Sequence, residues 1–408
     1  MQAAALKRSS ALLRGAVLLC VLGGCSRAPA PPFPTWYTPS VETRSQPFSD
    51  LLGLADQAEQ LAPAFKDRIA FRPADRRAVL QALGKPLGRL AKLVEKPIPF
   101  PDRSRFPFEV ASGHRGWRLL GRCLVWRVET CVADGHADDA ITNTLVATRF
   151  GYLLTQGNAG DASLGFGIVD EARQAMAPSL STLSAEQLTR LGNGLTAALR
   201  ARPSIERTLD QERRSMLAAV QFVQDSYSKG TWSPLRQGLD VDGREAVEYL
   251  IELKTKDGSK REDYFRRFAG EIDPEIDLLK SVAEKPVAAR GALPLPPSEG
   301  RAWRRFARHF FRGARAILQV SDRTLAKTRL FILECFIHRA IRENRTAPKS
   351  LSVFPADLTL DPYSGRRFVY RASGIDYRLY SIGADLRDDG GESDEAGGSP
   401  DMTLEGTS

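Results

Sequence analysis

The side chains able to do acid–base or metal chemistry are few in this chain and lie far apart. The sequence has four histidines, with no two at metal-ligand spacing: His114, His136, His309 and His338. His136 lies beside Asp138 and Asp139 in a turn predicted between two helices, but a metal site there needs ligands from elsewhere. No metalloprotease, hydrolase or nucleotide-binding motif occurs, so the sequence predicts a protein that is not an enzyme.

Carboxylates are concentrated near the C-terminus, where they could bind a hard cation. Residues 385–408 hold eight acidic side chains and one basic one, which gives this segment a net charge of −7. Because the whole chain has a net charge of +9, the remaining residues carry +16. Carboxylate oxygens are ligands that calcium prefers, but the same composition also suits a solvated acidic tail. The basic remainder suits anionic phospholipid or a solvated basic surface, and we expect no nucleic-acid partner.

The segment before these carboxylates predicts a β-hairpin. Turn residues occur at Asp361-Pro362 and Ser364-Gly365, and two alternating stretches follow at 367–371 and 376–382. An apolar helix is predicted just before this hairpin, over 324–344. The order of helix, turn, hairpin and acidic loop over residues 324–402 resembles the C-terminal half of type II secretion pseudopilins. The sharpest match is YSIGAD, from Tyr380 to Asp385.

The resemblance implies a small α+β module and a calcium loop. In the major pseudopilin the matching loop wraps calcium, which implies Asp385 and Asp401 as ligands here. The chain lacks the pilin-type start and a transmembrane helix leading into the module, so we expect that it cannot assemble as a standard pseudopilin.

The first residues predict export. Lys7, Arg8 and Arg14 precede the short apolar run GAVLLCVLGG, as in a secretory signal peptide. The run ends in LGGCS, which resembles the lipobox of bacterial lipoproteins and implies a lipid on Cys25; the alternative is an ordinary signal peptide. Ser26 after that cysteine implies the outer rather than the inner membrane, and the Pro-rich residues that follow predict an extended tether.

A basic amphipathic helix is predicted over 301–315. One face carries arginines that include Arg304, Arg305 and Arg308, and the other carries aromatic residues. Such a helix can lie on an anionic membrane surface. The favoured alternative is that the aromatic face packs into the core, because a second apolar helix follows at 324–344.

The rest of the chain predicts further helices. They cover 48–65, 73–96 with a break caused by Pro86, 180–199 with a cap at Ser184, 204–230, and two within 243–282. The small residues Gly135, Ala140 and Ala147 resemble half of a tetratricopeptide repeat, although no second copy is evident.

These patterns predict a mainly α protein with a helical, repeat-like body and a small C-terminal α+β module. The expected parts are a signal peptide at 1–24, a lipidated cysteine and tether at 25–45, a helical domain at 46–283, a Pro-rich linker at 284–300, the pseudopilin-like module at 301–402 and a tail at 403–408. We expect a lipid-anchored, non-catalytic envelope scaffold or interaction protein that binds protein partners, with a link to a secretion or pilus-like system. The alternatives are an envelope enzyme with an unrecognised site and an anionic-lipid-binding protein acting through 301–315.

Overall fold

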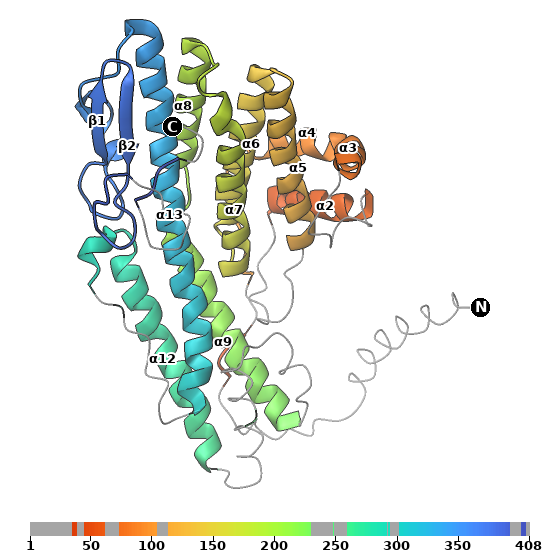
Figure 1. Cartoon of the computed structure of the whole chain (residues 1–408). Helices are drawn as coiled ribbons and strands as arrows, with labels where there is room; N and C mark the ends of the chain where they lie inside the picture. The colour runs from red at the N-terminus through yellow and green to blue at the C-terminus, as the bar shows by residue number, and fades with distance from the viewer. Residues whose placement is uncertain are drawn as a thin grey trace. The chain divides into compact units, whose positions relative to one another are not determined.

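The computed structural model describes residues 35–38, 45–61, 73–103, 113–229, 248, 259–291, 293, 302–391 and 401–404, with backbone alone for residues 73, 227, 259–264 and 302–310. The helices are α2 (Gln46–Leu61), α3 (Pro73–Ala82), α4 (Gly84–Leu93), α5 (His114–Ala133), α6 (Ala137–Leu154), α7 (Ala159–Met176), α8 (Ala185–Arg200), α9 (Ile205–Lys229), α12 (Ser259–Ala283), α13 (Ala302–Asn344) and α14 (Ala356–Thr359). Short 3-10 turns occur at η1 (Ala177–Ser179), η2 (Val287–Ala289) and η3 (Leu351–Val353), and the strands are β1 (Val369–Ser373) and β2 (Asp376–Tyr380). The fold is mainly α with a small α+β end, as predicted (Figure 1).

Local sequence explains where α4 and α8 begin. The Oγ of Ser184 accepts a hydrogen bond from the Gln187 amide at 3.2 Å, and the Gln187 side chain accepts one from the Ser184 amide at 3.0 Å. This reciprocal capping box confirms the predicted cap of α8. The predicted helix 73–96 is broken at Leu83 rather than at Pro86. Because proline clashes with the carbonyl four residues before it, a helix accepts Pro86 only in its first turn, where α4 has it.

Helices α6 and α7 approach each other through two glycines. A Cβ atom added to Gly165 would lie 2.3 Å from the Gly151 carbonyl oxygen, and one added to Gly151 would lie 2.5 Å from the Gly165 oxygen. No larger side chain fits this crossing without moving a backbone. The two helices thus form a tightly packed layer on which α5, α8 and α13 rest.

Helix α13 corrects one prediction, because the two helices expected at 301–315 and 324–344 are a single helix of 43 residues. The intervening segment contains no proline or glycine, and its Ser321, Asp322 and Thr324 are buried rather than turned out as a loop. One part of α13 packs on α12 and α9 and another on α7 and α8 (Figure 1).

The C-terminal hairpin confirms the predicted strands. β1 and β2 pair antiparallel from Val369 opposite Tyr380 to Ser373 opposite Asp376. Gly365 has a φ of +70°, and its amide donates to the Asp361 carbonyl at 2.9 Å, which closes the predicted turn.

Buried apolar side chains form two clusters. One joins α2 and α4 to α5 around Phe48 and Trp117, and the other joins α8 and α13 to the hairpin around Leu191, Phe331 and Leu379. The hairpin is therefore attached to the helical body through α13 (Figure 1). Among the described residues, no helix is long and apolar enough to cross a membrane.

Candidate functional site

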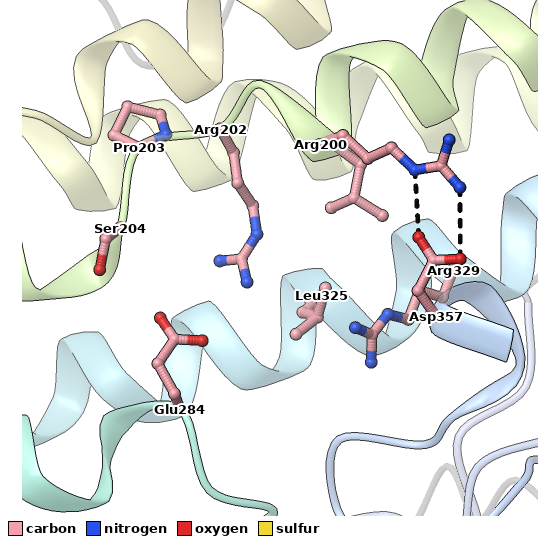
Figure 2. Close-up of a pocket in the computed structure, with 9 residues that line it drawn as sticks. Arg200, Arg202, Pro203, Ser204, Glu284, Leu325, Arg329 and Asp357 are labelled. Carbon is pink, nitrogen blue, oxygen red and sulfur yellow. Dashed lines mark hydrogen bonds and ion pairs between the residues drawn. The ribbon is translucent and has the colours of Figure 1, made fainter.

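Two hollows meet at the short connection between α8 and α9, where Pro203 lines both. The first, here called the arginine cavity, has a volume of about 310 Å³. Its lining residues are Leu199, Arg200, Arg202, Pro203, Ser204, Glu284, Leu325, Arg329 and Asp357. Figure 2 shows the Arg202 and Arg329 side chains extending toward the space from the connection and from α13, with Leu325 between them in the view.

The three arginines of this cavity differ in their partners. Arg200 forms a two-pronged pair with Asp357, at 3.1 and 3.3 Å, and these hydrogen bonds lower the pKa of the Asp357 carboxyl. Arg329 donates from Nη1 to the Leu360 carbonyl at 2.8 Å, while its Nε is buried without a hydrogen-bond partner. The Arg202 side chain makes no hydrogen bond or ion pair with any residue that the structure describes. Burial lowers the pKa of Arg329, and the nearby charge of Arg202 lowers it further.

A smaller hollow of about 180 Å³ continues from the arginine cavity and shares Arg202, Glu284, Leu325 and Arg329 with it. Its wall contains a buried ion pair, in which Arg290 Nη1 lies 2.5 Å and Nη2 2.7 Å from the oxygens of Asp322. Arg290 is therefore already neutralised, unlike Arg202.

The second hollow, here called the proline groove, has a volume of about 680 Å³. Its lining residues are Val94, Glu95, Lys96, Pro97, Ile98, Pro99, Arg149, Tyr152, Leu153, Gln156, Ala197, Ala198, Ala201, Pro203 and Arg207. Three of the charged residues are basic and one is acidic. Neither the Lys96 nor the Arg149 side chain makes a hydrogen bond or ion pair with a described residue, whereas the Arg207 side chain donates to the Phe100 carbonyl at 3.3 Å.

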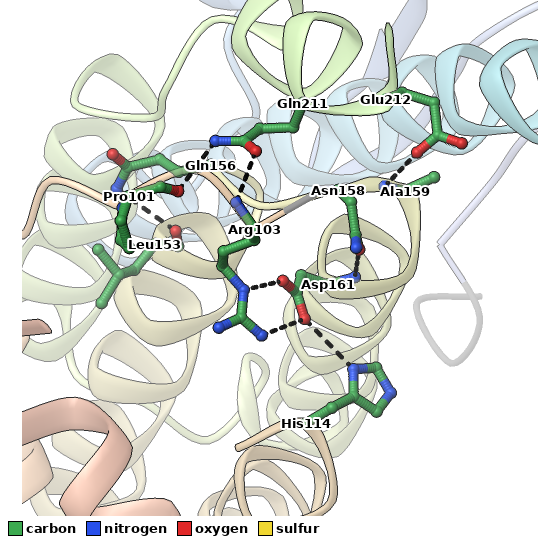
Figure 3. Close-up of polar contacts among 10 residues, drawn as sticks. All are labelled: Pro101, Arg103, His114, Leu153, Gln156, Asn158, Ala159, Asp161, Gln211 and Glu212. Carbon is green, nitrogen blue, oxygen red and sulfur yellow. Dashed lines mark hydrogen bonds and ion pairs between the residues drawn. The ribbon is translucent and has the colours of Figure 1, made fainter. Parts of the chain in front are cut away.

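The proline-rich wall of this groove is held in place by buried polar side chains. Gln156 donates to the Ile98 carbonyl at 3.0 Å, and Gln211 of α9 donates to the Pro101 carbonyl at 3.0 Å. The Oε1 atom of Gln211 also accepts from the Arg103 amide at 3.0 Å (Figure 3). Because these partners come from the end of α6 and from α9, the extended segment 97–103 is fixed along both helices.

An ion pair anchors the end of that wall in the core. Arg103 Nε lies 2.6 Å from Asp161 Oδ2, and their side chains are only 5% and 0% exposed. The Arg103 guanidinium also lies 4.6 Å from the centre of the Trp117 ring, and His114 Nδ1 lies 3.4 Å from Asp161 Oδ1 (Figure 3). In the same region Glu212 accepts from the Ala159 amide at the start of α7, and burial raises the pKa of Glu212. These groups are joined to one another and to the backbone, which indicates a structural role.

A further polar cluster lies where β2 meets α13. Tyr377 donates from its hydroxyl to Glu334 Oε2, and His338 Nε2 lies 3.7 Å from the same oxygen. Burial raises the pKa of Glu334 to about 7 and lowers that of His338. A carboxyl with such a pKa can exchange protons near neutral pH, but these residues line none of the hollows above, and their contacts attach the hairpin to the helix.

Several predicted site residues cannot be placed by side chain. Cys25 lies outside the described residues. Arg304, Arg305 and Arg308 lie in the first turns of α13, where the structure describes the backbone alone. Further along the same face, Arg315 forms a two-pronged pair with Glu275 of α12 at 2.6 and 2.8 Å, and Phe311 and Ala314 are buried. From residue 311 onward the helix therefore packs into the protein.

The two carboxylates implied as calcium ligands have different surroundings. Asp385 is exposed and accepts from the Arg387 amide at 3.2 Å. Asp401 is 2% exposed; its Oδ2 accepts from the Gly391 amide at 2.6 Å, and its Oδ1 is buried without a partner. No group of three His, Cys, Asp or Glu side chains within the described ranges is arranged to hold a metal ion.

The residues around His136, which were considered as part of a metal site, make other contacts. His136 occupies the N-cap position of α6, in the turn where it was expected. Asp138, however, pairs with Arg190 of α8 at 2.9 Å, so this carboxylate links two helices.

The sequence did not identify either hollow. The arginine cavity and the proline groove take their side chains from segments far apart in the chain, and no local motif contains them. No protein-family model, curated protein or solved structure matches the chain.

Proposed function

We propose that this chain is an exported, lipid-anchored, non-catalytic interaction protein of the bacterial envelope, and that it binds a protein partner in the proline groove. The proposed location in the envelope rests on the lipobox-like LGGCS around Cys25, and Ser26 favours the outer membrane. The observation that carries the binding role is the groove itself, a hollow of about 680 Å³ with unpaired basic side chains at its edge. A link to a secretion or pilus-like system rests on the resemblance of 324–402 alone.

The chemistry of the groove favours an extended acidic segment as the occupant. Lys96 and Arg149 have no carboxylate partner among the described residues, so an incoming carboxylate would satisfy them without breaking an existing pair. The lining also includes the small side chains of Ala197, Ala198 and Ala201, which leave room for a peptide backbone. The rigid wall at 97–103 means that little ordering of the groove accompanies binding.

The groove can be tested in solution with a labelled extended peptide that alternates Glu with Ala and Pro. We expect saturable binding that weakens with salt, and a loss of at least about fivefold in affinity in Arg149→Gln. Arg190→Gln is the matched control, because it removes the same charge from an exposed pair on α8 outside the groove. Equal loss in both variants, or no binding of the peptide, would contradict the proposal.

The lipid anchor and the outer-membrane location have a separate test. Wild-type protein should incorporate radiolabelled palmitate and fractionate with the outer membrane, and Cys25→Ser should do neither. Normal membrane fractionation of Cys25→Ser without label would refute the lipid anchor.

Calcium remains a second, narrower proposal for the acidic loop. The buried, unpartnered Oδ1 of Asp401 is the observation that favours it, while the exposed Asp385 contributes only if the loop closes on the ion. Millimolar calcium should raise the melting temperature of the wild type and not that of Asp401→Asn. An unchanged wild-type melting temperature would rule the site out.

A further inference from the structure

The charges of the arginine cavity do not balance. Arg200 and Asp357 neutralise each other through two hydrogen bonds. Arg202 has no described partner, and Arg329 has only a carbonyl partner and a buried, unsatisfied Nε. Glu284 is exposed and is not ion-paired to either arginine within the described chain. Two guanidinium groups therefore line one hollow without an ion-pair partner among the described residues.

The two arginines also repel each other: burial is the main cause of the lowered pKa of Arg329, the charge of Arg202 lowers it further, and Asp357 and Asp361 offset part of the shift. A folded chain keeps like charges close only when other contacts hold them there, and an anion between them relieves the repulsion. Arg329 is fixed by its bond to the Leu360 carbonyl, and Arg202 by its place between the end of α8 and Pro203.

A third donor lies on the opposite side of the cavity. The Oγ of Ser204 accepts from the Glu206 amide at 3.3 Å, so its own hydroxyl hydrogen stays available to a ligand. Ser204 directly precedes the 25-residue helix α9, whose N-terminal amides add partial positive charge there. The helix N-terminus adds a partial positive charge, while the two guanidinium groups supply the full charges that would bind an anion.

We propose that the arginine cavity is a binding site for a phosphate group, free or carried by a small organic alcohol. Three donors, two from the α8–α9 connection and one from α13, suit a tetrahedral oxyanion with several acceptor oxygens better than a planar carboxylate. The volume of about 310 Å³ exceeds that of phosphate, and Leu199, Pro203 and Leu325 offer an apolar wall for the attached carbon chain. The same group can come from a soluble phosphomonoester or from the headgroup of phosphatidic acid.

The site can be tested by thermal unfolding and calorimetric titration of the full chain, held in neutral detergent for the soluble probes and reconstituted without detergent for the vesicles. The probes are inorganic phosphate, glycerol 3-phosphate and vesicles of phosphatidic acid in phosphatidylcholine, with sodium chloride at matched ionic strength as the comparison. We expect saturable stabilisation, and at least about a tenfold loss of affinity in Arg202→Gln. The control is Arg213→Gln, which removes a charge from α9 at an exposed ion pair with Asp273 of α12. This variant should bind the phosphate probes as the wild type does.

A second readout separates a ligand site from a merely structural arginine. Without phosphate, Arg202→Gln should melt at the same temperature as the wild type or higher, because the change removes repulsion on Arg329. Binding of soluble probes indicates a free phosphomonoester, whereas binding of vesicles alone indicates a lipid headgroup. Stabilisation no greater than that by sodium chloride, undiminished binding by Arg202→Gln, or a lower melting temperature of that variant without ligand would overturn the proposal.

Discussion

Protonation of Glu334 should control how firmly the C-terminal hairpin is attached to α13. The side chain is 3% exposed, and its Oε2 accepts the hydroxyl of Tyr377 from β2. Burial raises its pKa from the usual 4.5 to about 7, since the Tyr377 hydrogen bond offsets only part of the cost of burying the charge. The perturbation is therefore a pH change, compared between the wild type and Glu334→Gln.

The magnitude follows from the difference between the two pKa values. Below pH 4.5 the carboxyl is protonated in both the folded and the unfolded chain, and its contribution to stability is fully present. As the pH rises toward 7, the unfolded chain releases its proton while the folded one retains it, so stability falls. The difference of about 2.5 between the pKa values corresponds to a loss of about 3 kcal/mol by pH 8.

The assay is urea unfolding of both proteins between pH 4 and pH 8. His338 contributes a pH dependence of stability with the opposite sign. Because its pKa is lowered in the folded chain, the unfolded chain binds more protons as the pH falls, and stability decreases. Repeating the comparison in a His338→Gln background removes that contribution. We expect the free energy of unfolding of the wild type to fall by about 3 kcal/mol relative to Glu334→Gln over this range. Parallel curves for the two proteins would refute the assignment of a buried, protonated Glu334.

Three further predictions, with four substitutions, test the packing of the body. Gly165→Ala should lower the free energy of unfolding by at least about 2 kcal/mol, because the new Cβ meets a carbonyl of α6. Gly167→Ala, on the open face of the same helix, is the control and should be neutral or stabilise by up to about 1 kcal/mol. Urea unfolding compares the two variants. Asp161→Asn should cost about 3–5 kcal/mol in the same assay, because Arg103 stays buried without its charge partner, and a loss below about 1 kcal/mol would contradict a buried ion pair. Ser184→Ala should lower stability by about 1 kcal/mol through loss of the capping box, and hydrogen exchange should show faster opening in the first turn of α8.

Features with a local cause were predictable from the sequence. The hairpin follows from turn residues around Asp361 and Gly365 and from alternating strands, and the cap of α8 follows from Ser184 and Gln187. The division of α13 into two helices, at 301–315 and 324–344, was wrong. In the folded chain Asp322 is neutralised by Arg290, a contact 32 residues away in the sequence.

The candidate site was not predictable for the same reason. The arginine cavity joins Arg202 to Arg329 and Asp357, and the proline groove joins Lys96 to Arg149 and the alanines of α8. Each arginine alone is an ordinary surface charge in a chain of net charge +9. Only the packing of α8 and α9 against α13 and segment 97–103 reveals which of them lack partners.

Site-specific photo-crosslinking in intact cells tests the central claim most directly. A photoreactive residue in place of Ala201 lies in the proline groove, and one in place of Glu186, exposed at the start of α8, is the control. The proposed function predicts a discrete adduct with an envelope protein from position 201, absent from position 186, that disappears when Lys96 and Arg149 are both replaced by Glu. No adduct from position 201, or the same adducts from both positions, would contradict it.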